Sequence, residues 1–191
     1  SKAKNVPFDR YMKGDKSALS ASAKRGLKLF NGKALCIKCH NGALFSDESY
    51  HNLGMPQNES FEEDPLRQIT LRYQNLIRGV PESVYRKADR DYGLYYTTKQ
   101  NIDKGKFRTP SLRELKYSAP FMHNGVFFEL SEVIDFYNKG GGNIPNKSPL
   151  MKELKLFESE KKDLEAFLLS LSSDKPLLMN KPALPPYAVM R

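Results

Sequence analysis

The chain has 191 residues, 39% of them hydrophobic, which is enough for one domain with its own core. No apolar run approaches the roughly 20 residues of a membrane-spanning helix. The first residues do not have the pattern of a leader, as expected for a chain whose leader was removed or that begins partway through a longer protein. The net charge of +9 comes from 31 basic residues that are mixed with 22 acidic ones without any block of five bases, so a generally basic surface is favoured over a nucleic-acid-binding site.

The first predicted helix leads directly into the two cysteines of the chain. Residues 1–19 are polar and are predicted as a linker. Ser20 and Ser22 are candidate N-caps of a helix that runs to about Phe30, because serine side chains accept hydrogen bonds from the free N–H groups of a first turn. The sequence Cys36-Ile-Lys-Cys-His40 follows the end of this helix.

The middle of the chain carries shorter signals. Residues 41–60 are rich in Gly, Asn and Ser and are predicted as a loop. Residues 65–89 have mixed helical signals that are broken at Gly79 and Pro81, and residues 91–113 hold short aromatic segments.

Two more helices are predicted in the last third of the chain. Ser131 caps a short helix that Gly140-Gly-Gly142 stops. A longer helix runs from Ser159 or Glu160 to about Leu171, and the tail over residues 174–191 is rich in proline and predicted to be extended. The apolar stripe of the last helix consists of Leu164, Phe167, Leu168 and Leu171.

The Cys36–His40 segment is the c-type haem attachment signature. Two cysteines one turn apart present their sulfurs to the two vinyl groups of a porphyrin, and the adjacent His40 then lies beneath the iron. A thioredoxin-type pair would follow a strand, whereas a helix is predicted here. A structural zinc site needs four ligands, and Cys39 and His40 are too close in sequence to share a tetrahedral metal. The motif therefore predicts one covalent haem c.

A second axial ligand must come from elsewhere in the sequence. Methionine would raise the reduction potential, and tyrosine would favour ferric iron. Each candidate also has an ordinary structural explanation, as core filler, a hydrogen-bonded histidine or a buried aromatic, and the residues alone do not separate them. The candidates are His51, Met55, Met122, His123 and Tyr137.

From about Pro7 to Ser172 the chain resembles the C-terminal half of bacterial dihaem cytochrome c peroxidases and the related MauG-type enzymes. Several segments carry this resemblance together. They are Pro7-Phe-Asp-Arg-Tyr11, Gly26–Phe30, Cys36–His40, His51-Asn-Leu-Gly54, Gly105–Arg113, Ala119-Pro-Phe-Met-His-Asn-Gly125, Leu130–Tyr137 and Asp163–Leu168.

The resemblance implies a distal iron ligand on the short helix after residues 119–125. Typical peroxidases of the family carry Met at that position and MauG-type enzymes carry Tyr, and this sequence has Tyr137. Met122 occupies a position where relatives also carry Phe, which makes it a poor ligand. The resemblance therefore implies His40 and Tyr137 as the two axial ligands.

Three further roles follow from the same resemblance. Family members bind calcium between their two domains through backbone carbonyls, and the matching positions are Ser118 and Pro120. Arg108 is implied as the partner of a haem propionate. His123 is implied as a residue that orders the haem pocket, with a plain structural hydrogen bond as the alternative.

The sequence also departs from the family pattern. Residues 58–90 form a longer insertion than the family leads us to expect, and Leu94 and Asn124 stand where Arg and Asp are usual. The chain has one haem motif and no tryptophan, whereas the family's N-terminal domain holds a second, peroxide-reducing haem. We therefore expect half of an enzyme.

These observations predict a mainly α fold, a class I cytochrome c-like domain with long loops and an insertion. The expected boundaries are a linker over 1–19, the haem domain over 20–173 and the tail over 174–191. The haem would pass electrons to a peroxide-reducing haem in a missing N-terminal domain, and the chain alone would have little peroxidase activity. The alternative is a stand-alone monohaem electron carrier.

The expected partners follow from the resemblance. They are the N-terminal haem domain, a small electron-donor protein or a protein substrate, and a second copy of the chain in a homodimer, with no nucleic acid and no membrane span. Because c-type haem is attached outside the cytoplasm, we expect a bacterial periplasmic location.

Overall fold

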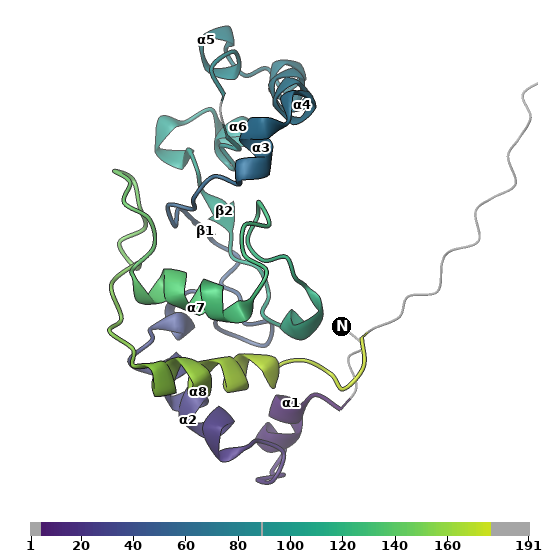
Figure 1. Ribbon diagram of the computed structural model, residues 1–191, viewed down its shortest axis with the longest axis vertical. Helices are drawn as coiled ribbons and strands as arrows, with labels where there is room; N and C mark the ends of the chain where they lie inside the picture. Colours follow the sequence, from purple (N-terminus) through teal and green to yellow (C-terminus); the bar gives the residue numbers. More distant parts are fainter. Residues whose placement is uncertain (1–4, 89, 177–191) are drawn as a thin grey trace, which may run out of the picture.

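The computed structural model describes residues 5–88 and 90–176. Its architecture is mainly helical, as the sequence predicts, with one very small sheet (Figure 1). The α-helices are α1 Pro7–Met12, α2 Ala21–Asn31, α3 Glu59–Glu63, α4 Pro65–Ile77, α5 Glu82–Tyr85, α6 Tyr95–Thr98, α7 Leu130–Asn138 and α8 Glu158–Leu169. The 3₁₀ helices are η1 Cys36–Lys38, η2 Asn101–Asp103 and η3 Leu115–Tyr117, and the strands are β1 Tyr50–His51 and β2 Phe107–Arg108.

Helices α2 and α8 lie side by side and form the centre of the fold, with α7 next to α8 (Figure 1). Their approach is very close at Gly26, where an added Cβ atom would lie 1.9 Å from the Asp163 carbonyl oxygen. Only glycine permits such contact between two backbones. Phe30 and Phe167 are fully buried at this contact, with ring centroids 5.1 Å apart.

The predicted ends of α2 and α8 agree closely with the structure. The Ser20 side chain caps α2 by accepting a hydrogen bond from Ala23 N–H at 3.0 Å, while Ser22 instead donates to Asp163 at 2.6 Å. Helix α8 begins at Glu158, slightly before the predicted start. The predicted stripe of α8 is confirmed, because Leu164, Phe167, Leu168 and Leu171 are all buried.

The predicted cap of α7 is wrong. The N-cap is Glu129, and Ser131 lies inside the first turn. The Glu132 carboxylate accepts hydrogen bonds from Phe128 N–H and Glu129 N–H, both at 2.9 Å. A carboxylate that satisfies two free N–H groups fixes the start of this helix better than a serine hydroxyl does.

Part of the predicted linker is folded against the domain. Helix α1 lies within residues 1–19, and Phe8 packs edge-on against Phe45 and Phe167 with centroids 5.2 and 5.7 Å away. Phe8 N–H also donates to Ser170 O at 3.1 Å. Val6 and Leu19 of the same stretch are buried as well, at 2% and 3% exposed, so the polar composition concealed several apolar anchors. The prolines of the predicted tail at 182, 185 and 186 lie outside the described residues.

The predicted insertion belongs to a second lobe at the other end of the molecule, formed by α3 to α6 (Figure 1). Its small core contains Val80, Tyr95 and Tyr96. The strands β1 and β2 lie between this lobe and α7, paired antiparallel with Tyr50 opposite Arg108 and His51 opposite Phe107. The strand β1 falls in the stretch predicted as a loop. Within the described ranges, no helix is long and apolar enough to cross a membrane.

Candidate functional site

The two cysteines lie on a tight turn immediately after α2. Leu35 has a left-handed φ of 55°, and the 3₁₀ helix η1 then brings His40 N–H to within 2.8 Å of Cys36 O. The Cys36 sulfur is enclosed and donates to Ala34 O at 3.4 Å. This turn places both thiols and the imidazole of His40 in one short loop, as haem attachment requires.

Burial raises the pKa of Cys36 to about 12, and burial also raises the pKa of Cys39. Both side chains are therefore neutral thiols at neutral pH. A redox-active pair needs a thiolate with a lowered pKa, and the motif follows a helix rather than a strand. The two observations agree with the predicted haem tethers and disfavour a thioredoxin-type site.

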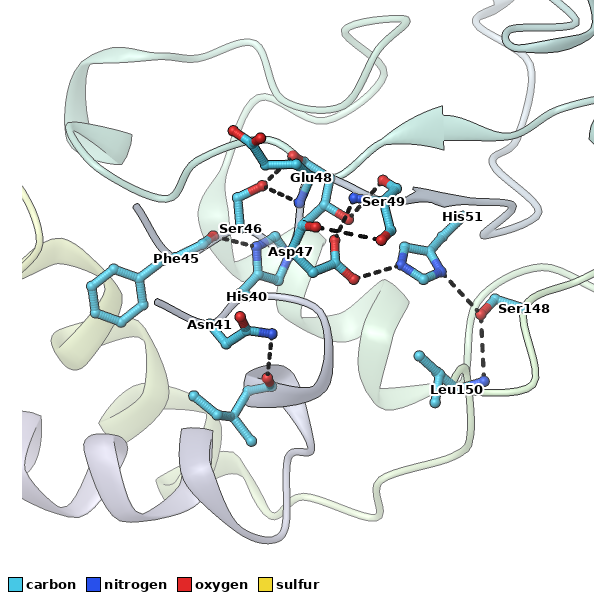
Figure 2. Close-up of polar contacts among 12 residues, drawn as sticks. His40, Asn41, Phe45, Ser46, Asp47, Glu48, Ser49, His51, Ser148 and Leu150 are labelled. Atoms are coloured by element: carbon cyan, nitrogen blue, oxygen red, sulfur yellow. Dashed lines mark hydrogen bonds and ion pairs between the residues drawn. The ribbon is translucent and has the colours of Figure 1, made fainter. Parts of the chain in front are cut away.

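The orientation of His40 is set by one hydrogen bond. Its Nδ1 atom lies 3.0 Å from Phe45 O (Figure 2). A carbonyl oxygen only accepts hydrogen bonds, so Nδ1 carries the proton and Nε2 keeps its lone pair. Burial lowers the pKa of His40, which favours the neutral ring. A neutral imidazole with an anchored Nδ1–H is the usual form of a metal-binding histidine.

Tyr137 comes from α7, on a different element from the attachment loop. Burial raises the pKa of Tyr137, so its hydroxyl keeps its proton at neutral pH. Ile134 of the same helix belongs to the core cluster that Cys36 packs against, so α7 and the attachment loop share one core. Across the described parts of the chain, no hydrogen bond uses this hydroxyl, which leaves its oxygen available to a ligand.

The other candidate axial ligands are held in different surroundings. His51 Nε2 lies 2.9 Å from Asp47 Oδ2, and its Nδ1 faces Ser148 Oγ at 3.5 Å (Figure 2). His123 is exposed and stacks on Phe107 with centroids 3.4 Å apart. Met55 and Met122 are half-buried, and Met122 has a left-handed φ of 69°.

The roles implied for Arg108 and the calcium positions stay predictions. Arg108 is exposed, and its Nη2 lies 2.6 Å from Glu48 Oε1. Its guanidinium therefore pairs with a protein carboxylate in this structure. Ser118 and Pro120 lie on an exposed loop. Among the described residues, no backbone N–H donates to the carbonyl oxygen of either one.

The sequence reasoning missed Asp47. Its backbone N–H donates to Cys39 O at 2.7 Å, and its carboxylate accepts from Ser49 N–H at 2.9 Å as well as contacting His51. The Cys39 sulfur, a carboxylate oxygen of Asp47 and a ring nitrogen of His51 all lie within 4.8 Å of one another. No motif marks Asp47, because its contacts with Cys39 and His51 arise from the fold of the loop between them.

The charge of Asp47 follows from these contacts. Burial opposes its ionisation, but hydrogen bonds from His51, Thr109 and Ser49 outweigh burial and hold the pKa of Asp47 below its ordinary value. Asp47 is therefore a carboxylate at neutral pH, next to the sulfur of Cys39.

The donor set fits a covalent haem. Two neutral thiols lie on one turn, His40 offers a free Nε2, and Tyr137 offers an oxygen from another helix. Cysteine sulfurs can tether a porphyrin, and imidazole and phenolate can ligate its iron. Their roles as tethers and axial ligands stay predictions.

Comparisons with known proteins point in the same direction. No protein-family model matches the chain. The chain is 58% identical to cytochrome-c peroxidase IdrP1 of Pseudomonas sp. (strain SCT), over 97% of this chain and 49% of that protein. It is 35% identical to the methylamine utilization protein MauG of Methylorubrum extorquens, over 94% of this chain and 42% of that protein.

A solved structure gives the same picture for the fold. The crystal structure of a MauG-like protein associated with microbial copper homeostasis aligns with a TM-score of 0.67 and 28% identity. The alignment covers 88% of this chain and 52% of that one. The chain thus spans about half the length of the curated relatives it matches.

Proposed function

The chain belongs to the family of dihaem cytochrome c peroxidases and MauG, and from this premise we propose that it is the covalent haem c electron-transfer domain of a longer oxidoreductase. The fold is then a class I cytochrome c-like domain that carries the α3–α6 lobe as an insertion. The bound haem would supply one-electron transfer at its iron.

The observation that carries the proposal is the anchored His40. Its Nδ1–H bond to Phe45 O leaves Nε2 as a ligand atom, and the two thiols of the same loop are positioned as tethers. Each thiol would add across one vinyl group, forming a C–S bond and moving the thiol proton to carbon. No oxidant is needed for that addition.

The proposal assigns Tyr137 as the second axial ligand. Its hydroxyl is enclosed on a helix that shares a core cluster with Cys36, whereas His51 is tied to Asp47 and His123 stacks on Phe107. A tyrosine ligand stabilises ferric iron and lowers the reduction potential. Two protein ligands also leave peroxide no position on this iron, so the chain alone should not turn over peroxide.

The activity of the whole protein is part of the same proposal. A further haem domain would reduce peroxide and exchange electrons with this one. The electrons would come from a small donor protein or, as in MauG-type enzymes, from a protein substrate. Calcium at the Ser118 and Pro120 carbonyls, a homodimer and a periplasmic location complete the proposal. They are supported by the family resemblance alone.

The test is an optical spectrum of the chain produced in a host that attaches c-type haem, recorded ferric and then reduced with dithionite. We expect a c-type spectrum with a tyrosinate charge-transfer band that Tyr137→Phe abolishes. The matched control is Tyr95→Phe, a buried tyrosine of the other lobe, 3% exposed, which should leave the band unchanged.

Three other outcomes have clear meanings. A low-spin spectrum with the signature of Met ligation would discard Tyr137. A protein without covalent haem would overturn the proposal itself. An upstream gene segment without a second haem motif would instead favour the stand-alone monohaem carrier.

A further inference from the structure

Asp47 is the charged group that the proposed function leaves without a role. Its carboxylate lies within 4.8 Å of the Cys39 sulfur, and its backbone N–H donates to Cys39 O at 2.7 Å. The side chain is 18% exposed, so water screens its charge only in part.

The surroundings of Asp47 keep the charge in place. The groups that face it are His51 from β1, Ser49 N–H from the same loop, Thr109 after β2, and His40 at longer range. Ser49 N–H and His51 Nε2 donate hydrogen bonds to the carboxylate, which stabilises its charged form. At pH 8, Asp47 therefore contributes one negative charge beside the attachment loop.

We propose that the Asp47 carboxylate lowers the reduction potential of the haem held by Cys36, Cys39 and His40, an inference that rests on the proposed function. Reduction adds one electron to the iron and removes one unit of positive charge from the site. A fixed negative charge nearby favours the more positive ferric state. Removing that charge must then raise the potential.

The expected size follows from Coulomb's law. At an effective dielectric constant of about 20, a unit charge within roughly 12 Å of a redox centre changes an equilibrium constant about tenfold. Asp47 lies beside a sulfur that would be bonded to the porphyrin edge. For a one-electron couple, a tenfold change corresponds to about 59 mV.

The neighbouring residue provides a matched control. Glu48 carries the same charge in the same loop, but its side chain is 60% exposed and it pairs with Arg108 at 2.6 Å. Asp47→Asn and Glu48→Gln remove one negative charge each and change the net charge of the protein equally. The difference between the two variants therefore reports the position of the charge.

The experiment is a spectroelectrochemical titration of the haem-loaded chain at pH 8. We expect Asp47→Asn to raise the ferrous-to-ferric ratio at a fixed potential about tenfold, with unchanged ferric and reduced spectra, and Glu48→Gln to change it much less. Asp47→Glu keeps the charge and should stay near the wild type. If Asp47→Asn attaches no haem, Asp47→Ser removes the same charge with a smaller side chain.

The outcomes separate this inference from the proposed function. Equal shifts for Asp47→Asn and Glu48→Gln overturn the inference, since the position of the charge would then not matter. A shift for Asp47→Glu as large as that for Asp47→Asn also overturns it, because the effect would come from geometry. A wild-type chain without covalent haem overturns the proposed function instead.

Discussion

The two ends of the molecule bury very different shares of their apolar side chains. At one end, α2 and α8 meet at a glycine, and the rings of Phe30 and Phe167 are fully buried between them. At the other end, α4 presents much of its apolar surface to solvent. Its exposed residues are Leu66 at 74%, Ile69 at 60%, Tyr73 at 61%, Leu76 at 49% and Ile77 at 64%.

This contrast shows which part of the chain carries the stability of the domain. Hydrophobic stabilisation scales with the apolar surface removed from water, and the larger cluster of buried residues surrounds α2 and α8 while the smaller one has Val80, Tyr95 and Tyr96. The attachment loop leaves the end of α2, so it is anchored on the well-packed side. We expect the two ends to respond unequally to equivalent substitutions.

The largest expected effect comes from truncating Phe167, which is fully buried and contacts the rings of Phe8, Phe30 and Phe45. Phe167→Ala should lower the free energy of unfolding by about 3–5 kcal/mol, measured by urea titration.

Tyr95→Ala is the matching change in the other lobe. Hydrogen exchange should then rise at α6 while α8 keeps its protection; loss of protection in α8 would show one cooperative unit.

Gly26 offers the next test, at the point where the two helices touch. A Cβ atom there would lie 1.9 Å from Asp163 O and 2.8 Å from Phe167 Cβ, so α2 and α8 must move apart. Gly26→Ala should therefore lower the free energy of unfolding by about 1–3 kcal/mol despite the better helix propensity of alanine. Lys28→Ala, on the exposed side of α2, should change it by less than about 0.5 kcal/mol.

A smaller effect is expected at Asp163, which joins the two helices through polar contacts. It accepts from Arg25 Nε and Nη2, both at 2.7 Å, and from Ser22 Oγ at 2.6 Å. The Arg25 guanidinium, then Ser22, lowers the pKa of Asp163. Because Arg25 is 61% exposed and partly screened, Asp163→Asn should lower the free energy of unfolding by about 1–2 kcal/mol.

The pH dependence of that difference has a definite sign. A carboxylate with a lowered pKa in the folded state stabilises the fold above its ordinary pKa of about 3.9. This contribution is lost as the pH falls through the lowered value. Thermal unfolding of the wild type and Asp163→Asn should therefore differ at pH 7 and converge in strong acid.

The smallest effect is expected on the exposed face of α4. Ile69→Gln should change the free energy of unfolding by less than about 0.5 kcal/mol, because the side chain is already 60% exposed. The same substitution at Ile134, which is 3% exposed on α7, should cost several times more. Equal losses at the two positions would mean that the α4 face is covered in solution.

The sequence predicted the elements whose signals are local. The caps and apolar spacing of α2 and α8 lie within a few residues of each other, and the attachment motif is contiguous, so these elements were found nearly at their observed bounds. Helix α1 was missed because Phe8 finds its partners far away in the sequence. The role of Asp47 was missed for the same reason, since Thr109 reaches it only after the chain has folded.

The pairing of α2 with α8 also bears on the order of events during folding. The bond between Ser22 and Asp163 spans 141 residues of chain, and contacts between distant segments form late, because a long loop must close first. Until α8 is in place, the core that Cys36 packs against lacks Leu164, Phe167 and Leu168. We therefore expect both thiols to be most reactive toward a covalent modification during this interval, before the last helix docks and completes that core.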